Sequence, residues 1–198
     1  MTGSVNYDVR SFINVHGDKM ISGDGLKLVG FHFGRRFGAE EHIKSLRRRY
    51  GMRSWITRHL SRAGIGKDKL VEIYKTLIRP VLEYGAVAFH GGMTDLQSES
   101  LERLQMAALK NIYGPELSYN KCLDASGLER LSVRRTRLME NFATKAKDNP
   151  RFSARWFPIR EESRYDLRRR EEYREELATT NRLKNSPIFA MRRLLNQM

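Results

Sequence analysis

The chain of 198 residues has a single cysteine, Cys122, so it can form neither an internal disulfide nor a cysteine-rich zinc site. This scarcity is typical of a reducing compartment, and we expect an intracellular protein of the cytoplasm or nucleus. No apolar run approaches the roughly 18 residues that span a bilayer, so no contact with a membrane is expected.

Acidic residues are also few. The 23 Asp and Glu residues stand against 37 Lys and Arg, and the net charge of +14 favours a polyanionic partner.

The sequence also lacks recognisable catalytic patterns. It contains no Gly-x-x-x-x-Gly-Lys phosphate loop and no His-Glu-x-x-His metal motif, and its five histidines are spread over separate segments. Cys122 has no recognisable base partner and is better interpreted as a small buried side chain. We therefore predict no catalytic residue, no metal site and no cofactor in this chain.

Extended and helical patterns follow one another along the chain. Residues 5–33 are rich in β-formers interrupted by turn signals, and Leu26 to Phe33 predicts one strand that ends at Gly34. After Gly38 the apolar spacing changes to a helical period. That period predicts helices over about 39–63, 67–84, 94–113, 118–126, 128–146 and 186–198.

These elements predict a mainly α fold with a small N-terminal antiparallel β portion (α+β). Residues 1–36 supply short strands, which would bury too little alone and must pack on helices or on an absent partner sheet. Residues 37–150 are expected to form a helical bundle. Residues 151–198 are expected to form a charged C-terminal tail, whose densely charged part from Arg164 to Lys184 is either a solvated helix or a disordered segment. The tail ends in a short helix opened by Ser186-Pro187.

Pro80 lies inside the helix with the strongest periodicity. Proline has no N–H and crowds the preceding turn, so the Thr76 carbonyl should lack its usual amide partner. The sequence therefore predicts a kink near residues 76–79.

The first predicted helix is strongly basic. Its apolar face is expected to run from Ile43 to Leu60 and to include Met52 and Trp55. Against seven Lys and Arg residues it carries only two acids, Glu40 and Glu41. Arginine forks suit phosphate oxygens, so this pattern favours a nucleic-acid backbone over an ordinary solvated face, which would mix the two signs. The candidate binding residues are Lys44, Arg47, Arg48, Arg58 and Arg62.

A second candidate feature is the short segment Phe31-His32-Phe33, which lies between Gly30 and Gly34. Glycines at these positions would let the backbone approach a ligand closely. A strand that simply enters a turn explains the same composition equally well.

Three stretches resemble one protein family. Leu26 to Gly34, followed by Glu41-His42-Ile43, resembles the strand region after the catalytic palm of non-LTR retrotransposon reverse transcriptases. Ile73 to Gly85 is similar to the family's thumb helix, with its Tyr-Lys, Arg-Pro-Val-Leu and Tyr-Gly pattern. Leu101 to Gly114 resembles the helix that follows it. Together these motifs cover about residues 20–150 in the family's order.

The resemblance implies a non-catalytic fragment. The family's RNA-directed DNA polymerase chemistry uses an adjacent aspartate pair that holds Mg²⁺, and this chain has no Asp-Asp dipeptide. The chain is expected to begin after that point, without fingers and most of the palm. The implied partners are an RNA/DNA template–primer duplex and the missing palm and fingers region. The family's primer grip, which holds the primer 3′ end, corresponds to Leu28, Gly30, Phe31, Phe33 and Gly34.

A different class of function also fits the sequence. The 186–198 helix could make the chain a helical protein-interaction module, with its basic charge serving solubility alone. The arrangement of the cations on the first helix discriminates between the two hypotheses. One contiguous positive face supports nucleic-acid binding, whereas cations scattered among acids support the alternative.

Overall fold

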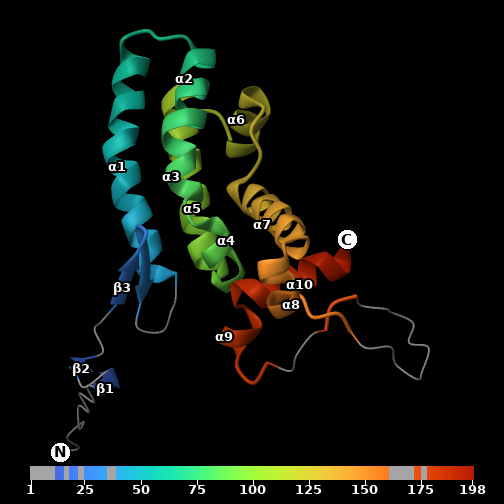
Figure 1. Cartoon of the computed structure of the whole chain (residues 1–198). Coiled ribbons are helices and arrows are strands. Elements are labelled where there is room, and N and C mark those ends of the chain that lie inside the picture. Colours follow the sequence, from blue (N-terminus) through green and yellow to red (C-terminus); the bar gives the residue numbers. More distant parts are fainter. Residues whose placement is uncertain (1–11, 16–17, 22–24, 35–38, 161–171, 175–177) are drawn as a thin grey trace, which may run out of the picture.

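The computed structural model describes residues 12–15, 18–21, 25–34, 39–160, 172–174 and 178–198. The described chain is mainly helical with a small antiparallel β portion near the N-terminus, which confirms the predicted fold class (Figure 1). The β-formers at 5–11 and most of the charged stretch at 164–184 lie outside the described residues.

The β portion consists of two separate hairpins. Strand β1 (Phe12–Val15) pairs with β2 (Asp18–Ile21), and β3 (Gly25–Leu28) pairs with β4 (Phe31–Gly34). The single strand predicted from Leu26 to Phe33 is therefore wrong, because the chain reverses at Val29 and Gly30. Both residues have positive φ, 48° and 78°, as a tight two-residue hairpin turn requires. A β-branched residue is rare in that region, which is why the local pattern favoured a continuous strand.

The helices form a bundle whose long members lie side by side. Helix α1 (Glu40–Arg62) runs antiparallel to the segment made of α2 (Lys67–Ile73), the π-helical turn η1 (Tyr74–Ile78) and α3 (Arg79–Glu83), and α5 (Asp95–Tyr113) packs against α1 (Figure 1). The remaining elements are α4 (Ala86–Phe89), η2 (His90–Gly92), α6 (Tyr119–Ser126), α7 (Leu131–Lys147), α8 (Pro150–Trp156), α9 (Asn181–Lys184) and α10 (Pro187–Gln197).

Local signals set several helix ends. Thr94 caps α5 through a capping box with Gln97, and Gly114 ends the same helix. Ser186 and Pro187 open α10 as the N-cap and first position, as predicted.

The Pro80 irregularity takes the form of a π-bulge. The N–H of Arg79 donates to the carbonyl of Tyr74, five residues back, in place of the regular four-residue bond. Pro80 follows as the second residue of α3, where its missing N–H is tolerated. The π-helical turn spans residues 74–78 and so overlaps the predicted kink at 76–79.

Two hydrophobic clusters hold the bundle together. The larger one joins the β3–β4 hairpin to α1, α2, α3 and α5 through buried residues such as Leu46, Tyr74, Leu82 and Leu109. Among the described residues this cluster holds more buried side chains than the second one, and their burial stabilises the fold.

The smaller cluster changes the interpretation of residues 151–198. Met139 and Ala143 of α7 are buried together with Phe157, Met191 and Leu195. Tyr173 joins them, and its backbone N–H donates to Asn196 Oδ1 at 3.0 Å. Phe157, Tyr173 and part of α10 therefore pack on α7, which the charge pattern alone did not predict. Most of the stretch from Arg164 to Lys184 lies outside the described residues, so its expected character stays a prediction.

Candidate nucleic-acid interface

Helix α1 has one buried and one basic face. Its buried residues are His42, Ile43, Ser45, Leu46, Tyr50, Ser54 and Thr57. Each predicted binding residue is exposed, and at 3.6 residues per turn the five fall within an arc of about 100°. They extend over about 27 Å of the helix, from Lys44 to Arg62. The structure therefore brings all five together on one side of α1.

The acidic neighbours are confined to the first turn. Lys44 Nζ lies 2.8 Å from Glu41 Oε1 and 3.1 Å from Glu40 Oε1, and these two bonds raise the pKa of Lys44. Arg47, Arg48, Arg58 and Arg62 have no ion-pair partner in the described parts of the chain. The uncompensated positive face therefore begins at Arg47, one turn later than the sequence indicated.

Two apolar side chains share this basic face. Trp55 is 55% exposed and Met52 is 66% exposed, so the prediction that both belong to the core was wrong. The Trp55 and His59 rings lie 4.0 Å apart, and His59 Nδ1–H donates to the Trp55 carbonyl at 3.0 Å. The helical period carried the missed signal, because Trp55 is seven residues after Arg48 and seven before Arg62 and therefore shares their side of the helix.

Gly51 lies in the middle of the same face. It is exposed, and a Cβ added to it would meet nothing within 4 Å. Glycine inside a helix costs roughly 0.5–1 kcal/mol relative to alanine, and no packing contact within the described chain explains that cost. The gap it leaves between Arg47 and Trp55 allows close approach by a molecule outside the chain.

The β3–β4 hairpin lies at the N-terminal part of α1 (Figure 1). Two side chains hold its turn: Arg49 Nη2 donates to the Gly30 carbonyl at 3.1 Å, and the Tyr84 hydroxyl donates to the Val29 carbonyl. The Arg49 guanidinium also lies 5.7 Å from the centre of the Tyr84 ring. Arg49 is therefore a positioning residue for the hairpin, although it belongs to the same basic run.

Phe31 anchors the hairpin in the core. Its ring stacks on His42 at 4.1 Å and lies beside Phe89. A Cβ on Gly85, whose φ is +75°, would come within 2.8 Å of the Phe31 ring, so this glycine serves both the turn and the close contact. Burial lowers the pKa of His42, whose Nε2–H donates to the Tyr84 carbonyl at 2.8 Å.

The residues predicted for the primer grip have unequal positions. Leu28 is exposed before the turn, Gly30 forms the turn, and Phe31 is buried. Phe33 and Gly34 lie in β4 and pair with Leu26 and Gly25 of β3. Among the residues of this hairpin whose burial is described, Leu28 and Val29 form an exposed tip, while Phe31 serves packing.

Comparison with known proteins gives no match to this chain among family models, curated proteins or solved structures. Within the described residues, no group of three or more His, Cys, Asp or Glu is placed to hold a metal ion. No helix in the described part of the chain is long and apolar enough to cross a membrane.

Proposed function

We propose that α1 contacts the backbone of a nucleic-acid duplex, as the thumb of a reverse transcriptase contacts its RNA/DNA template–primer. The observation that carries this proposal is the row of four arginines, Arg47, Arg48, Arg58 and Arg62, which are exposed on one face and have no acidic partner among the residues that the structure describes. Their guanidinium forks suit phosphate oxygens, and the length of the row matches several phosphates along a strand.

The rest of the interface supports the same proposal. Gly51 permits close approach at the middle of the row, and Trp55 offers an exposed aromatic surface beside it. The tip of the β3–β4 hairpin is held rigidly at one end of the row by Arg49 and Tyr84. Such a rigid support is what a primer-gripping element requires.

The chain acts in this proposal as a non-catalytic fragment of a retrotransposon RNA-directed DNA polymerase. The assignment to this polymerase family depends on the sequence motifs from Leu26 to Gly114. It extends the binding proposal to a parent enzyme whose catalytic aspartates lie outside this chain.

The alternative, a protein-interaction module that uses the 186–198 helix, has less support. The buried residues of α10, including Ala190, Met191 and Leu195, pack against α7 in the same chain. The apolar face that such a module would present is therefore already occupied.

The test is a fluorescence anisotropy titration of the protein with two RNA–DNA hybrids of unrelated sequence. With about four phosphate contacts, raising salt from 50 to 200 mM should weaken binding by about two powers of ten. The double variant Arg47→Ala/Arg48→Ala should lower the salt slope by about two for both hybrids.

A matched control removes the same charge elsewhere. Arg151 and Arg155 are exposed on α8, and replacing both by alanine should leave the salt slope unchanged. Equal effects of the two double variants, or a flat salt dependence, would refute a specific role for α1.

A further inference from the structure

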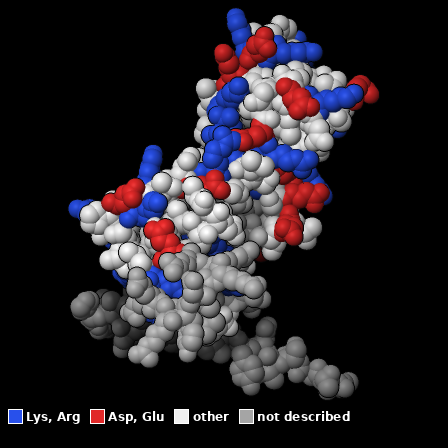
Figure 2. Space-filling view, turned by 90° about the vertical axis from the view of Figure 1, so that its right-hand side faces the viewer, with Lys and Arg blue, Asp and Glu red and all other residues white. Residues whose placement is uncertain are grey.

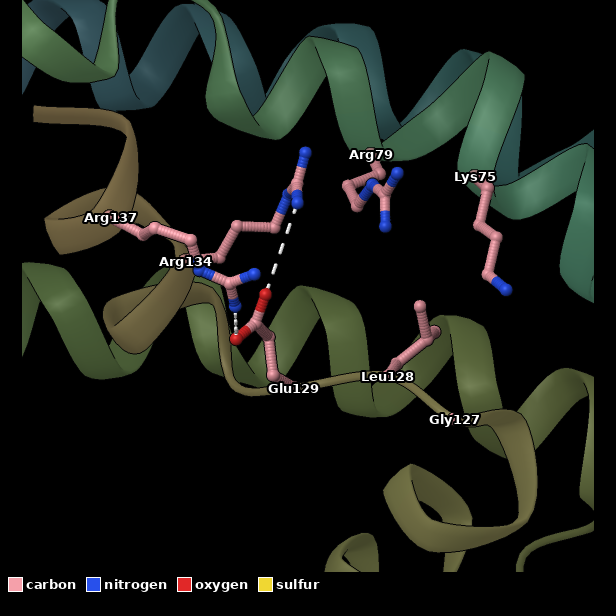
Figure 3. A pocket seen from close by; sticks show the side chains of 7 residues that line it. All are labelled: Lys75, Arg79, Gly127, Leu128, Glu129, Arg134 and Arg137. Carbon is pink, nitrogen blue, oxygen red and sulfur yellow. Dashed lines mark ion pairs between the residues drawn. The ribbon is translucent and has the colours of Figure 1, made fainter. Parts of the chain in front are cut away.

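A basic cleft lies between the segment made of α2, η1 and α3 and the start of α7. Helices α6 and α7 lie on the side of that segment away from α1 (Figure 1), and Figure 2 views the molecule from this side, where many Lys and Arg side chains gather. The volume of the cleft is about 500 Å³, within the range of small-molecule sites. Figure 3 shows Lys75 and Arg79 on one wall, facing the loop that carries Glu129. The lining residues are Lys75, Arg79, Gly127, Leu128, Glu129, Arg134 and Arg137.

The charges in this cleft are only partly compensated. Arg134 pairs with Glu83 and lies 3.9 Å from Glu129, while Arg137 pairs with the other Glu129 oxygen. Arg79 lies 3.7 Å from Glu83. Two carboxylates thus face four cations, and Lys75 has no ion-pair partner within the described chain.

Two of the four cations are also partly desolvated. The side chains of Arg79 and Arg134 are 22% and 25% exposed, so solvent screens their field less than it screens the open row on α1. Bringing like charges together at a partly buried position is unfavourable for folding, because each cation loses hydration without gaining a full set of acidic partners. A bound anion would relieve that repulsion.

The local backbone points to the same place. Lys75 belongs to the π-helical turn and Arg79 is the first residue after it. Short π-bulges occur frequently at functional sites, because the extra residue displaces side chains from the regular helical register.

We propose that this cleft binds a small phosphomonoester. Such a group carries close to two negative charges at neutral pH, which matches the surplus of two, and arginine forks bind its oxygens bidentately. A small ligand is favoured over a nucleic-acid strand because the cations converge on one hollow, whereas a strand needs a row of them. The Glu129 carboxylate lies beside Arg134 and pairs with Arg137 in the same chain, and it therefore competes with the ligand for these two side chains.

The experiment is isothermal titration calorimetry of the full chain with inorganic phosphate, adenosine 5′-monophosphate and adenosine. Lys75→Ala should weaken binding of the phosphorylated probes roughly tenfold, because one charge-assisted contact is lost. Glu129→Gln should strengthen it several-fold, because the competing carboxylate is removed. Lys69→Ala on the adjacent α2 is the matched control and should have no effect.

The probes separate the two sources of a phosphate group. Equal affinity for inorganic phosphate and the nucleotide identifies a site for the phosphate alone, and tighter nucleotide binding identifies a nucleotide site. Absence of binding to both phosphorylated probes, binding of adenosine alone, or weakening by Glu129→Gln would overturn the proposal. The double variant Arg47→Ala/Arg48→Ala should bind phosphate normally, so this proposal and the role of α1 can fail independently.

Discussion

Replacing Gly51 by alanine should have opposite effects on stability and on nucleic-acid binding. The added Cβ meets no atom within 4 Å, and Gly51 is not among the positive-φ glycines. Alanine at a helix interior is more stable than glycine by roughly 0.5–1 kcal/mol. For a chain of this size that gain corresponds to a rise in melting temperature of about 1–4 °C.

The same methyl group should weaken binding. If a duplex packs closely over α1 between Arg47 and Trp55, an added Cβ displaces it, and overpacking at a tight contact costs about 1–3 kcal/mol. We expect the dissociation constant for an RNA–DNA hybrid to increase at least fivefold. Thermal unfolding followed by circular dichroism and an anisotropy titration measure the two effects on one preparation.

Gly66→Ala provides the control for this experiment. Gly66 also faces open space, but it lies in the connection between α1 and α2 and outside the basic row. Its replacement should leave affinity unchanged. A stabilised Gly51→Ala protein with unaltered affinity would refute close approach at this position, and a destabilised one would refute the structural argument itself.

Two further predictions concern acid stability and catalysis. Burial and the nearby Arg135 guanidinium lower the pKa of His90 to about 4, whereas an unfolded histidine titrates near 6.5. The stability contributed by neutral His90 is therefore fully present above about pH 6.5 and is lost as the pH falls towards 4, by at most about 3 kcal/mol because the ring is partly solvated. His90→Gln should flatten this acid limb in urea unfolding measured from pH 7 to 4, and an identical limb in both proteins would contradict the assignment. The purified chain should also extend no primer with Mg²⁺ or Mn²⁺, and extension above a vector control would disprove the non-catalytic interpretation.

Local signals in the sequence were sufficient to predict several ends of the longer helices. Three such signals are the N-cap at Thr94, the helix end at Gly114 and the helix start at Ser186-Pro187. Each depends only on residues close by in the sequence, so it could be predicted without knowledge of the tertiary structure. The predicted cluster of cations on α1 was also a local feature, because helical spacing alone decides which of them share a face.

The features that the sequence did not predict depend on distant contacts. The turn at Val29 is stabilised by Tyr84, 55 residues away, which overrides the strand preference of valine. Phe157 and Tyr173 bury their rings with residues of α7 and α10, and no charge pattern in 151–198 reveals those partners. The basic cleft joins Lys75 and Arg79 to Arg134 and Arg137, which only the folded chain brings together.

The basic face of α1 and the basic cleft are two different electrostatic environments. Arg47, Arg48, Arg58 and Arg62 on α1 are exposed and have no ion-pair partner within the described chain, so their attraction to a polyanion is strongly screened by salt. In the cleft, Arg79 and Arg134 are partly buried beside Glu83, so their field responds less to ionic strength, whereas Arg137 is exposed. Binding at the two surfaces should consequently differ in its dependence on salt concentration. At 200 mM, binding of hybrids should be severely weakened, while phosphate binding in the cleft should retain most of its affinity.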